Sequence, residues 1–373
     1  MTMLAWLSLA FVVYTYFGYA ILLRLLPQSL RPEGPSATSG EGLPSISVVI
    51  AARNEAAHIG AKLDDIAAQE YPVDRVEVLV GSDGSTDATD EIVRSHRSRP
   101  RPFRFEPIGK TAVLNRVVAE ATGDILVFMD VRQQVTHDAF RRFAHRLQDP
   151  GVAAVGGELA LTDEAGHETA SGVGVYWKFE KWLRRRESDL GLLTGLSGAL
   201  YAMKRELFQA PPDDMILDDV MIPLSAARRG YRLIVDDQIR MLDRVAEGDR
   251  EFRRKVRTLI GNFQLFAFLL AHPRPFPAAL LFSLMSHKVC RAVTPIALIT
   301  LAVGSLGMEP GLGRNALLAG QGVVYGVGAM TLTSGGRIRG KLPSVCTTFC
   351  VLNAAAFVAL LKFSTGRYRT TWK

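Results

Sequence analysis

Val-Gly-Ser-Asp-Gly-Ser-Thr-Asp occupies residues 80–87, Gly-Lys-Thr-Ala-Val-Leu-Asn residues 109–115, and Ile-Leu-Val-Phe-Met-Asp residues 125–130. The apolar run at 125–129 is typical of a strand buried on both faces, and it ends in a carboxylate at Asp130. A second carboxylate, Asp83, follows another short apolar run. Open α/β sheets bind nucleotides at the carboxyl ends of their strands. The three stretches together therefore predict an α/β fold with a nucleotide site.

The residues before this stretch complete a β-α-β unit. Ser45–Ala51 alternates apolar residues as a first strand does, an amphipathic helix is expected from about His58 to Gln69, and Val76–Val80 is expected to form the next strand. Each connecting turn then lies at a strand's carboxyl end, so the charged residues of several turns are expected at one edge of the sheet.

Asp83 stands where the base or ribose of a nucleotide can donate hydrogen bonds to it. Ser85 or Thr86 is expected to cap a helix that continues through Val93. The alternative interpretation is that Asp83-Gly84-Ser85 is only a cap and a turn.

Lys110 and Asp130 are the next two candidates. Lys110 leads into a helical run at 112–121, where the helix dipole disfavours a cation, and an anionic ligand would remove that conflict. The alternative is a solvated surface lysine. Asp130 can hold Mg²⁺ or Mn²⁺ against a diphosphate, because these ions prefer oxygen ligands. The alternative is an aspartate that caps the next helix near Thr136.

Membrane segments explain why 48% of the residues are hydrophobic. Leu4–Leu26 is long enough to cross a bilayer. We interpret it as an uncleaved anchor, not a signal peptide, because no charged region precedes it and no small-residue cleavage site clearly follows. Three further candidate spans lie near the carboxyl end, at 278–304, 316–333 and 345–361. The first is interrupted by His287, Lys288 and Arg291, so its beginning is expected near the interface.

These features divide the chain into six parts. The stretch after the anchor is rich in Pro, Gly and Ser, as linkers are. The predicted parts are an N-terminal transmembrane helix (1–26), a linker (27–44), an α/β domain (45–248), a basic amphipathic interface helix (249–275), a C-terminal transmembrane region of about three helices (276–363) and a basic tail (364–373).

The net charge of +7 could indicate nucleic acid, but much of the excess lies next to the predicted membrane segments. Membrane headgroups or anionic phosphates explain it better, and no nucleic-acid-binding motif is present. Cys290, Cys346 and Cys350 all fall in predicted membrane regions, which argues against a disulfide framework. The sequence therefore predicts an integral membrane protein, expected in a bacterial inner membrane, with its α/β domain in the cytoplasm.

The order of motifs resembles a known family. Ala-Ala-Arg-Asn-Glu at 51–55, Ser-Asp-Gly-Ser-Thr-Asp at 82–87, Gly109-Lys110 with Leu114-Asn115, and the strand ending in Asp130 resemble family 2 glycosyltransferases of the GT-A fold. The likeness is strongest to their membrane-bound, cellulose-synthase-like branch and covers about residues 45–265. It implies a Rossmann-like GT-A catalytic domain flanked by transmembrane and interfacial helices.

The resemblance also implies roles for individual residues of the donor site. Glu55 and Asp83 would contact the base and ribose of a nucleotide-sugar, with the backbone near Ala52 closing the pocket. Lys110 would help to hold the nucleotide. Asp130 would be the first acid of the family's metal-binding Asp-x-Asp.

Arg132 departs from that pattern, because it stands where the second acid of Asp-x-Asp is expected. Either Asp130 binds Mg²⁺ or Mn²⁺ with help from another side chain or water, or Arg132 offsets the diphosphate charge directly.

The acceptor side and the catalytic base are implied by two further segments. Ser197-Gly198-Ala199-Leu200-Tyr201 resembles the segment that lines the acceptor side, and Leu217-Asp218-Asp219-Val220 the acidic pair that carries the base. An acceptor hydroxyl must lose its proton as it attacks, so a positioned carboxylate is needed. We assign this role to Asp219, supported by Asp218. The alternative is a helix amino terminus decorated with acids.

Residues 253–258 stand in the place of the family's Gln-x-x-Arg-Trp motif. Arg257 matches its arginine and would bind the diphosphate by a charge-assisted bond. Arg254 replaces the glutamine, on the acceptor side, and Thr258 replaces the tryptophan, which puts the binding of a processive polymer in doubt. A basic amphipathic helix lying on headgroups is a compatible alternative.

The function predicted from these residues is inverting transfer of a sugar from a nucleotide-sugar, with a uridine diphosphate donor expected, to a lipid or lipid-linked acceptor at the membrane. Inversion follows from one base, one leaving diphosphate and no candidate nucleophile. Two alternatives stay open: a polysaccharide synthase that extends a glycan, and an inactive nucleotide-binding membrane scaffold. The expected partners are the donor, the acceptor and membrane lipids, with self-association possible and without nucleic acid.

Overall fold

The structure is a computed structural model of the chain. It describes residues 1–27, 42–162, 174–244, 248–334, 337–338 and 340–370. Most of the predicted linker, at 27–44, and the last three residues of the predicted basic tail lie outside the described residues.

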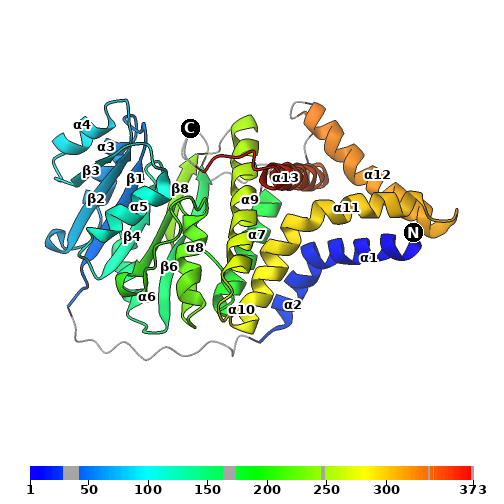
Figure 1. Ribbon diagram of the computed structural model, residues 1–373, viewed down its shortest axis with the longest axis horizontal. Coiled ribbons are helices and arrows are strands. Elements are labelled where there is room, and N and C mark those ends of the chain that lie inside the picture. Colours follow the sequence, from blue (N-terminus) through cyan, green and yellow to red (C-terminus); the bar gives the residue numbers. More distant parts are fainter. Residues whose placement is uncertain (28–41, 163–173, 245–247, 335–336, 339, 371–373) are drawn as a thin grey trace.

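Within the described residues, eight strands form one mixed sheet in the order β3-β2-β1-β4-β7-β6-β8-β5 (Figure 1). β2, β1 and β4 run parallel, whereas β7 is antiparallel to both β4 and β6. The strands are β1 (Ile46–Ala52), β2 (Val76–Asp83), β3 (Arg101–Phe105), β4 (Ile125–Met129), β5 (Gln134–Val135), β6 (Val152–Thr162), β7 (Leu200–Lys204) and β8 (Arg232–Arg244).

Helices cover both faces of this sheet because its central strands are apolar on both sides. β1 and β4 are buried along their whole length. α5 and α8 pack on one face and α3 and α6 on the other, which gives two hydrophobic clusters separated by the sheet. These helices are α3 (Ile59–Ala67), α4 (Thr89–Ser95), α5 (Lys110–Ala119), α6 (Ala139–Leu147) and α8 (Asp218–Ala227).

The structure corrects the local prediction around Asp83. β2 continues through Asp83, so this residue is the last of the strand and does not follow it. Neither Ser85 nor Thr86 caps the next helix. The Ser85 hydroxyl instead pairs with Ser82 Oγ at 2.9 Å, and the carboxylate of Asp87 accepts the N–H of Thr89, the first residue of α4, at 3.0 Å.

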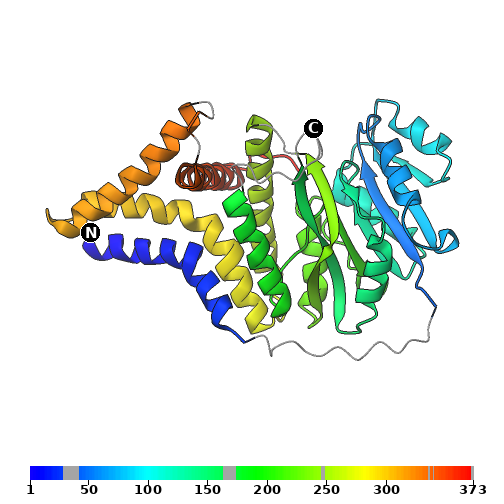
Figure 2. The same cartoon turned by 180° about the vertical axis from the view of Figure 1, so that it is seen from behind.

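Two long helices, α7 (Gly174–Asp189) and α9 (Gly248–Ala271), lie between the sheet and a group of apolar helices (Figures 1 and 2). α9 carries a buried apolar face that includes Val256, Ile260 and Phe263. This face packs against α13.

In the part of the chain that the structure describes, four helices are long and apolar enough to cross a membrane. The first two each contain a π-helical segment, η1 or η5, and the chain changes direction between α10 and α11 (Figure 1). Such π segments are a common cause of helix bending. The first helix is Thr2–Leu25 and comprises α1 (Thr2–Val13), η1 (Tyr14–Gly18) and α2 (Tyr19–Leu25). The second is Ala278–Leu306 and comprises α10 (Ala278–Ser283), η5 (Leu284–Val289) and α11 (Cys290–Leu306). The other two are α12 (Leu312–Thr333) and α13 (Lys341–Ser364).

Candidate active site

The parallel strands bring the predicted donor-side residues to one edge of the sheet. Ala52 ends β1 and lies beside Ser82 of β2, and Asp130 directly follows β4, the other neighbour of β1. Because parallel neighbours end at the same edge, Asp83 and Asp130 lie at one edge of the sheet, on either side of β1.

Asp83 is fully buried and anchors the turn that leads to α5. Its Oδ1 accepts the backbone N–H groups of Ile108 and Gly109, at 2.7 and 3.0 Å. Its Oδ2 lies 3.8 Å from the guanidinium of Arg53 and makes no hydrogen bond with the described residues. A buried carboxylate oxygen without a hydrogen bond marks a place for a ligand's donor group, such as a ribose hydroxyl or a base N–H.

Glu55 and Arg132, both predicted to contact the donor, bind one another. Arg132 Nε lies 3.0 and 3.1 Å from the two carboxylate oxygens of Glu55, and its terminal nitrogen lies 2.8 Å from Oε1. This two-pronged pair is a strong form of ion pair. The side chain of Arg132 stays 62% exposed.

Lys110 lies among carboxylates at the start of α5. Its Nζ is 3.0 Å from Asp130 Oδ1 and 3.6 Å from Asp218 Oδ2. Burial works to lower the pKa of Lys110, but the charges of Asp130, Asp218 and Asp219 outweigh it and raise that pKa. The expected conflict between this cation and the helix dipole is therefore resolved by protein carboxylates, without an anionic ligand.

The acidic pair forms the first turn of α8. Asp219 Oδ2 accepts the N–H of Gly198 at 2.9 Å, and the Asp219 carbonyl accepts the N–H of Leu196 at 3.1 Å. Burial raises the pKa of Asp218 and of Asp219, and the nearby Lys110 opposes the rise. A carboxylate whose pKa is raised is a better proton acceptor than an ordinary one, as a general base requires.

Two predicted site residues, Arg257 and Arg254, lie on α9 and have different surroundings. Arg257 of α9 interacts electrostatically with the acids: burial lowers its pKa, and the charges of Asp218 and Asp130 raise it. Its guanidinium also donates to the carbonyl of Thr370 at 3.2 Å. Arg254 points elsewhere and pairs with Glu251, one turn away on the same helix, at 2.8 Å.

Ser197 lies beside Gly198, on the segment that contacts Asp219. Its side chain is partly exposed, and its carbonyl accepts the N–H of Leu200 at 3.2 Å. That Ser197 and Gly198 lie on the acceptor side stays a prediction.

Lys288 was not assigned to the site from the sequence, and Tyr201 was named only as the last residue of the acceptor-side segment, although both interact electrostatically with Asp219. The Tyr201 hydroxyl is buried and makes no hydrogen bond with the described residues, and burial, together with the charges of Asp218 and Asp219, raises its pKa. Lys288 acts electrostatically on Asp219 from the second apolar helix. The only sequence signal for Lys288 was a charged residue inside an apolar stretch.

A divalent cation would find one exposed protein ligand at this site. The Asp130 carboxylate is 40% exposed at the strand ends. Among the described residues, no group of three or more His, Cys, Asp or Glu side chains is arranged to hold a metal ion. Mg²⁺ is commonly bound through one or two carboxylates and the phosphates of a substrate, so the residues fit a metal that arrives with a diphosphate and not a preformed metal cage.

Comparisons with known proteins agree with this geometry. Residues 47–210 match the family model of glycosyl transferase family 2. The chain is 26% identical over 195 residues to a beta-monoglucosyldiacylglycerol synthase of Synechocystis sp., which covers 51% of this chain and 41% of that protein. It is 30% identical over 146 residues to an N-acetylglucosaminyltransferase of a Rhizobium species, covering 38% of this chain and 32% of that protein. The chain therefore spans less than half the length of either relative.

A solved structure resembles nearly the whole chain. It is a mannosyltransferase from Pyrobaculum calidifontis in complex with GDP-Man and Mn²⁺, with a TM-score of 0.74, 24% identity, and coverage of 98% of this chain and 100% of that one. The likeness shows that the two proteins share a fold. Together with the family match, it leads to one conclusion: residues 47–210 form a glycosyl transferase family 2 domain, and the α/β domain has the GT-A fold.

Proposed function

We propose that this protein is an inverting glycosyltransferase that moves a sugar from a nucleoside-diphosphate sugar to a lipid or lipid-linked acceptor at a membrane. One observation carries the proposal: the partly buried carboxylate of Asp219 is held by the Gly198 N–H beside a cluster in which Lys110 lies between Asp130 and Asp218. This arrangement offers a base, a cation for a diphosphate and a carboxylate for a metal within one site.

The donor fits the edge of the sheet in a defined orientation. The free Oδ2 of Asp83 and the backbone at Ala52 mark the nucleoside end, and Lys110 and Arg257 the diphosphate end. Arg132 closes the rim through its pair with Glu55. We propose a uridine diphosphate sugar as the donor.

In the proposed reaction, an acceptor hydroxyl oxygen attacks the anomeric carbon and its proton passes to Asp219. The bond between that carbon and the diphosphate oxygen breaks, and its electron pair leaves with the nucleoside diphosphate. Lys110 and Arg257 bind the released negative charge. A Mg²⁺ or Mn²⁺ ion, held by Asp130 and the diphosphate oxygens, would supply Lewis-acid stabilisation of the same charge.

The acceptor is proposed to be lipid or lipid-linked because four apolar helices adjoin the catalytic domain. One relative, of Synechocystis sp., has a name that describes synthesis of a glucosylated diacylglycerol. We therefore propose an integral membrane protein, in a bacterial inner membrane with the catalytic domain in the cytoplasm. The six-part division inferred from the sequence is part of this proposal.

A growing glycan is a second candidate acceptor. Several relatives are named N-acetylglucosaminyltransferases, a name that does not specify a lipid acceptor. Thr258, in the place where the family's tryptophan is expected, offers no aromatic face on which the sugar of a long polymer could stack. We therefore rank this candidate second.

The proposal is tested by incubating the full chain, purified in detergent, with a panel of UDP-sugars and GDP-sugars, with and without Mn²⁺ or Mg²⁺. Released nucleoside diphosphate is measured for wild type, for Asp219→Asn and for a control, Asp213→Asn, whose carboxylate lies on the exposed surface. Release that is lost only in Asp219→Asn supports the proposal. Failure of UDP, GDP and their sugars to bind contradicts it and favours a scaffold.

A further inference from the structure

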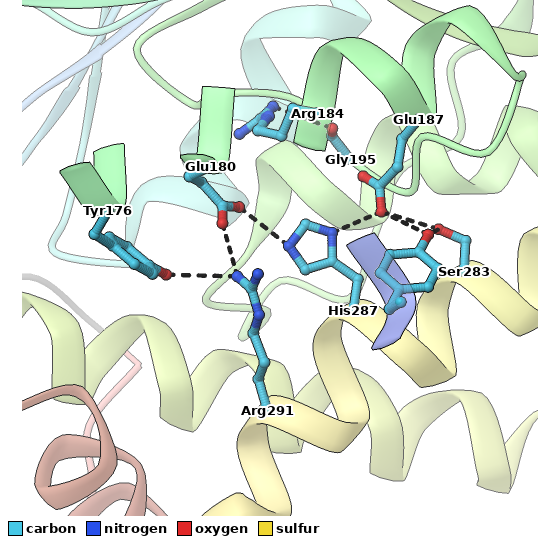
Figure 3. Close-up of polar contacts among 9 residues, drawn as sticks. Tyr176, Glu180, Arg184, Glu187, Gly195, Ser283, His287 and Arg291 are labelled. Atoms are coloured by element: carbon cyan, nitrogen blue, oxygen red, sulfur yellow. Dashed lines mark hydrogen bonds and ion pairs between the residues drawn. The ribbon is translucent and has the colours of Figure 1, made fainter. Parts of the chain in front are cut away.

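A cluster of buried polar side chains joins α7 to the apolar helices (Figure 3). Its members come from α2, α7, α10, η5 and α11, and each contacts another member directly. We call it the junction cluster: Tyr19, Tyr176, Glu180, Glu187, Ser283, His287 and Arg291. Ionisable groups inside apolar helices are costly, so such a cluster calls for a functional explanation.

Glu187 is the centre of one half of the junction cluster. Its Oε1 accepts the hydroxyl of Tyr19 at 2.9 Å and that of Ser283 at 3.2 Å, and it lies 2.7 Å from His287 Nδ1. Glu187 is 1% exposed. One buried oxygen near the carboxyl end of α7 thus holds groups from two of the four apolar helices.

Glu180 is the centre of the other half, two turns earlier on α7. It lies 3.1 Å from His287 Nε2 through one oxygen and accepts the guanidinium of Arg291 at 2.7 Å through the other. Tyr176 contacts that guanidinium only at 3.5 Å. His287 is therefore fixed between two carboxylates of one helix, and Tyr176 is the most weakly attached member.

A short segment leads from Glu187 to the catalytic acids. We call residues 190–198 the acceptor segment. Its beginning is tied to α7, because the Leu192 N–H donates to the Glu187 carbonyl at 2.7 Å. Farther along, Arg184 donates to the Gly195 carbonyl at 3.3 Å (Figure 3).

The other end of the acceptor segment holds the proposed base. The N–H groups of Leu196 and Gly198 donate to the carbonyl and to the carboxylate of Asp219, at 3.1 and 2.9 Å. The segment also crosses between two hydrophobic clusters: Leu192 packs in the one that contains Tyr19, whereas Leu196 belongs to the core of the catalytic domain. A continuous path of packed and hydrogen-bonded groups therefore runs from Tyr19 to Asp219.

The helical segment η5, which contains His287, also acts on Asp219 electrostatically. Lys288 follows His287 in η5, and its positive charge works to lower the pKa of Asp219, whereas burial, the larger effect, raises that pKa. Fixing His287 between Glu180 and Glu187 thereby also fixes the position of this charge.

We infer that the junction cluster positions Asp219. The contact between Glu187 and His287 holds the second apolar helix against α7, and the acceptor segment, which is bound to α7, holds the carboxylate of the base in place. The inference rests on the proposed function, because it gives Asp219 the role of base. It makes Glu187 and His287 positioning residues, and it makes catalysis depend on correct packing of the apolar helices.

Amide hydrogen exchange of the full chain in detergent tests the path without needing the substrate. The amides of Leu192, Leu196 and Gly198 report the acceptor segment, and those of β1 report the core. We expect Glu187→Leu to speed exchange in the segment about tenfold and to leave β1 unchanged. We expect Glu187→Gln to stay near wild type, because its amide oxygen can accept the same three contacts.

Two matched variants keep the test decisive where Glu187→Leu fails to fold. Tyr19→Phe removes one hydroxyl that contacts Glu187, and Tyr176→Phe removes a hydroxyl on the Glu180 side. We expect about threefold faster exchange in the acceptor segment for Tyr19→Phe and no change for Tyr176→Phe. Equal exchange in these two variants, or Glu187→Gln exchanging as fast as Glu187→Leu, overturns the inference.

Measurements of UDP affinity and kcat distinguish a positioning role of the junction cluster from a general loss of structure. We expect UDP affinity to be unchanged in Tyr19→Phe and Glu187→Leu, whereas kcat for transfer from the donor identified in the panel falls. Weaker UDP binding in parallel with kcat would show a merely structural role and overturn the inference. If wild type transfers no sugar, the proposed function fails, and the exchange experiment still decides whether the cluster controls Asp219.

Discussion

Gly198 donates its backbone N–H to Oδ2 of Asp219 at 2.9 Å, across 21 positions of the chain. This bond joins the acceptor segment to the first turn of α8. A Cβ on Gly198 would lie 3.0 Å from Asp219 Oδ2 and 3.3 Å from its Cβ. The close approach explains why a glycine stands at this position, and the hydrogen bond fixes one oxygen of the proposed base.

Gly198→Ala is expected to displace that carboxylate and to lower kcat about 10- to 100-fold, because small misplacements of a reacting group are costly. Affinity for UDP should not change, because the donor site lies at the strand ends. Gly320→Ala is the control, since its added methyl meets nothing within 4 Å. Steady-state kinetics and UDP titration check the prediction, and an unchanged kcat in Gly198→Ala would argue against Asp219 as the base.

The rate should depend on pH through the acidic pair. Burial raises the pKa of Asp218 to about 6 and also raises that of Asp219, against the opposing charge of Lys110. A base works only when deprotonated, and the pKa of Asp219 is raised, so kcat/KM should fall with decreasing pH already above the ordinary aspartate value of about 4. The profile is measured over the pH range in which thermal unfolding shows a folded protein. A profile whose acid limb lies at or below that ordinary value would contradict the assignment.

Lys110→Met removes the cation between Asp130 and Asp218. UDP affinity should fall about tenfold or more, because a charge-assisted contact to the diphosphate is lost. The pKa of the acidic pair should rise further, which moves the acid limb of the rate profile to higher pH. Lys110→Arg, which keeps the charge, should retain most of the affinity. Isothermal titration with UDP distinguishes the two, and equal affinities for wild type and Lys110→Met would exclude a donor-binding role.

Arg132→Asp restores the second acid of the family's Asp-x-Asp and breaks the pair with Glu55. We expect the concentration of Mn²⁺ that half-saturates activity to fall about tenfold, since a second carboxylate joins Asp130. Arg132→Ala separates this gain from the loss of the Glu55 pair, and it should not improve metal use. No change in metal dependence for Arg132→Asp would show that Asp130 does not bind the ion.

Glu77 is expected to stabilise the fold in a pH-dependent way. Burial works against its charge, but hydrogen bonds from Ser47, Thr122 and Arg101 lower the pKa of Glu77 to about 2, from 4.5. A lowered folded-state pKa stabilises fully above pH 4.5, and the contribution is lost as the pH falls toward 2. Glu77→Gln should cost about 1–2 kcal/mol at pH 7. Thermal unfolding of both forms should show a gap that narrows below pH 4.5, whereas a constant gap would contradict the mechanism.

The sequence allowed the strands and helices at this edge of the sheet to be predicted, because their signals are local, whereas the roles of the site residues stay predictions. The run at 125–129 forms β4 as expected, and helix α5 begins at Lys110. The family and the GT-A fold followed from short motifs in order and were confirmed by the comparisons. Membership of the cellulose-synthase-like branch stays a prediction.

Other features depend on long-range contacts that no local pattern contains. The Glu55–Arg132 pair joins the turns after two different strands, and nothing at either position indicates its partner. Lys288 is one charge in an apolar run, and only the packing of η5 against the catalytic domain brings it near Asp219. The prediction that Arg254 lies on the acceptor side did not consider a nearby ion-pair partner. Glu251 stands three positions earlier on the same helix face, and Arg254 pairs with it.

The most direct test of the central claim is transfer of a radiolabelled sugar from the best UDP-sugar or GDP-sugar into the lipid fraction of membranes that contain the full chain. Wild type and Asp219→Asn are compared after a UDP titration has shown that the two proteins bind UDP equally well. We predict labelled lipid with wild type and at least a hundredfold less with Asp219→Asn, since a general base contributes about 10²–10⁴ in rate. Equal labelling by the two proteins would contradict the account.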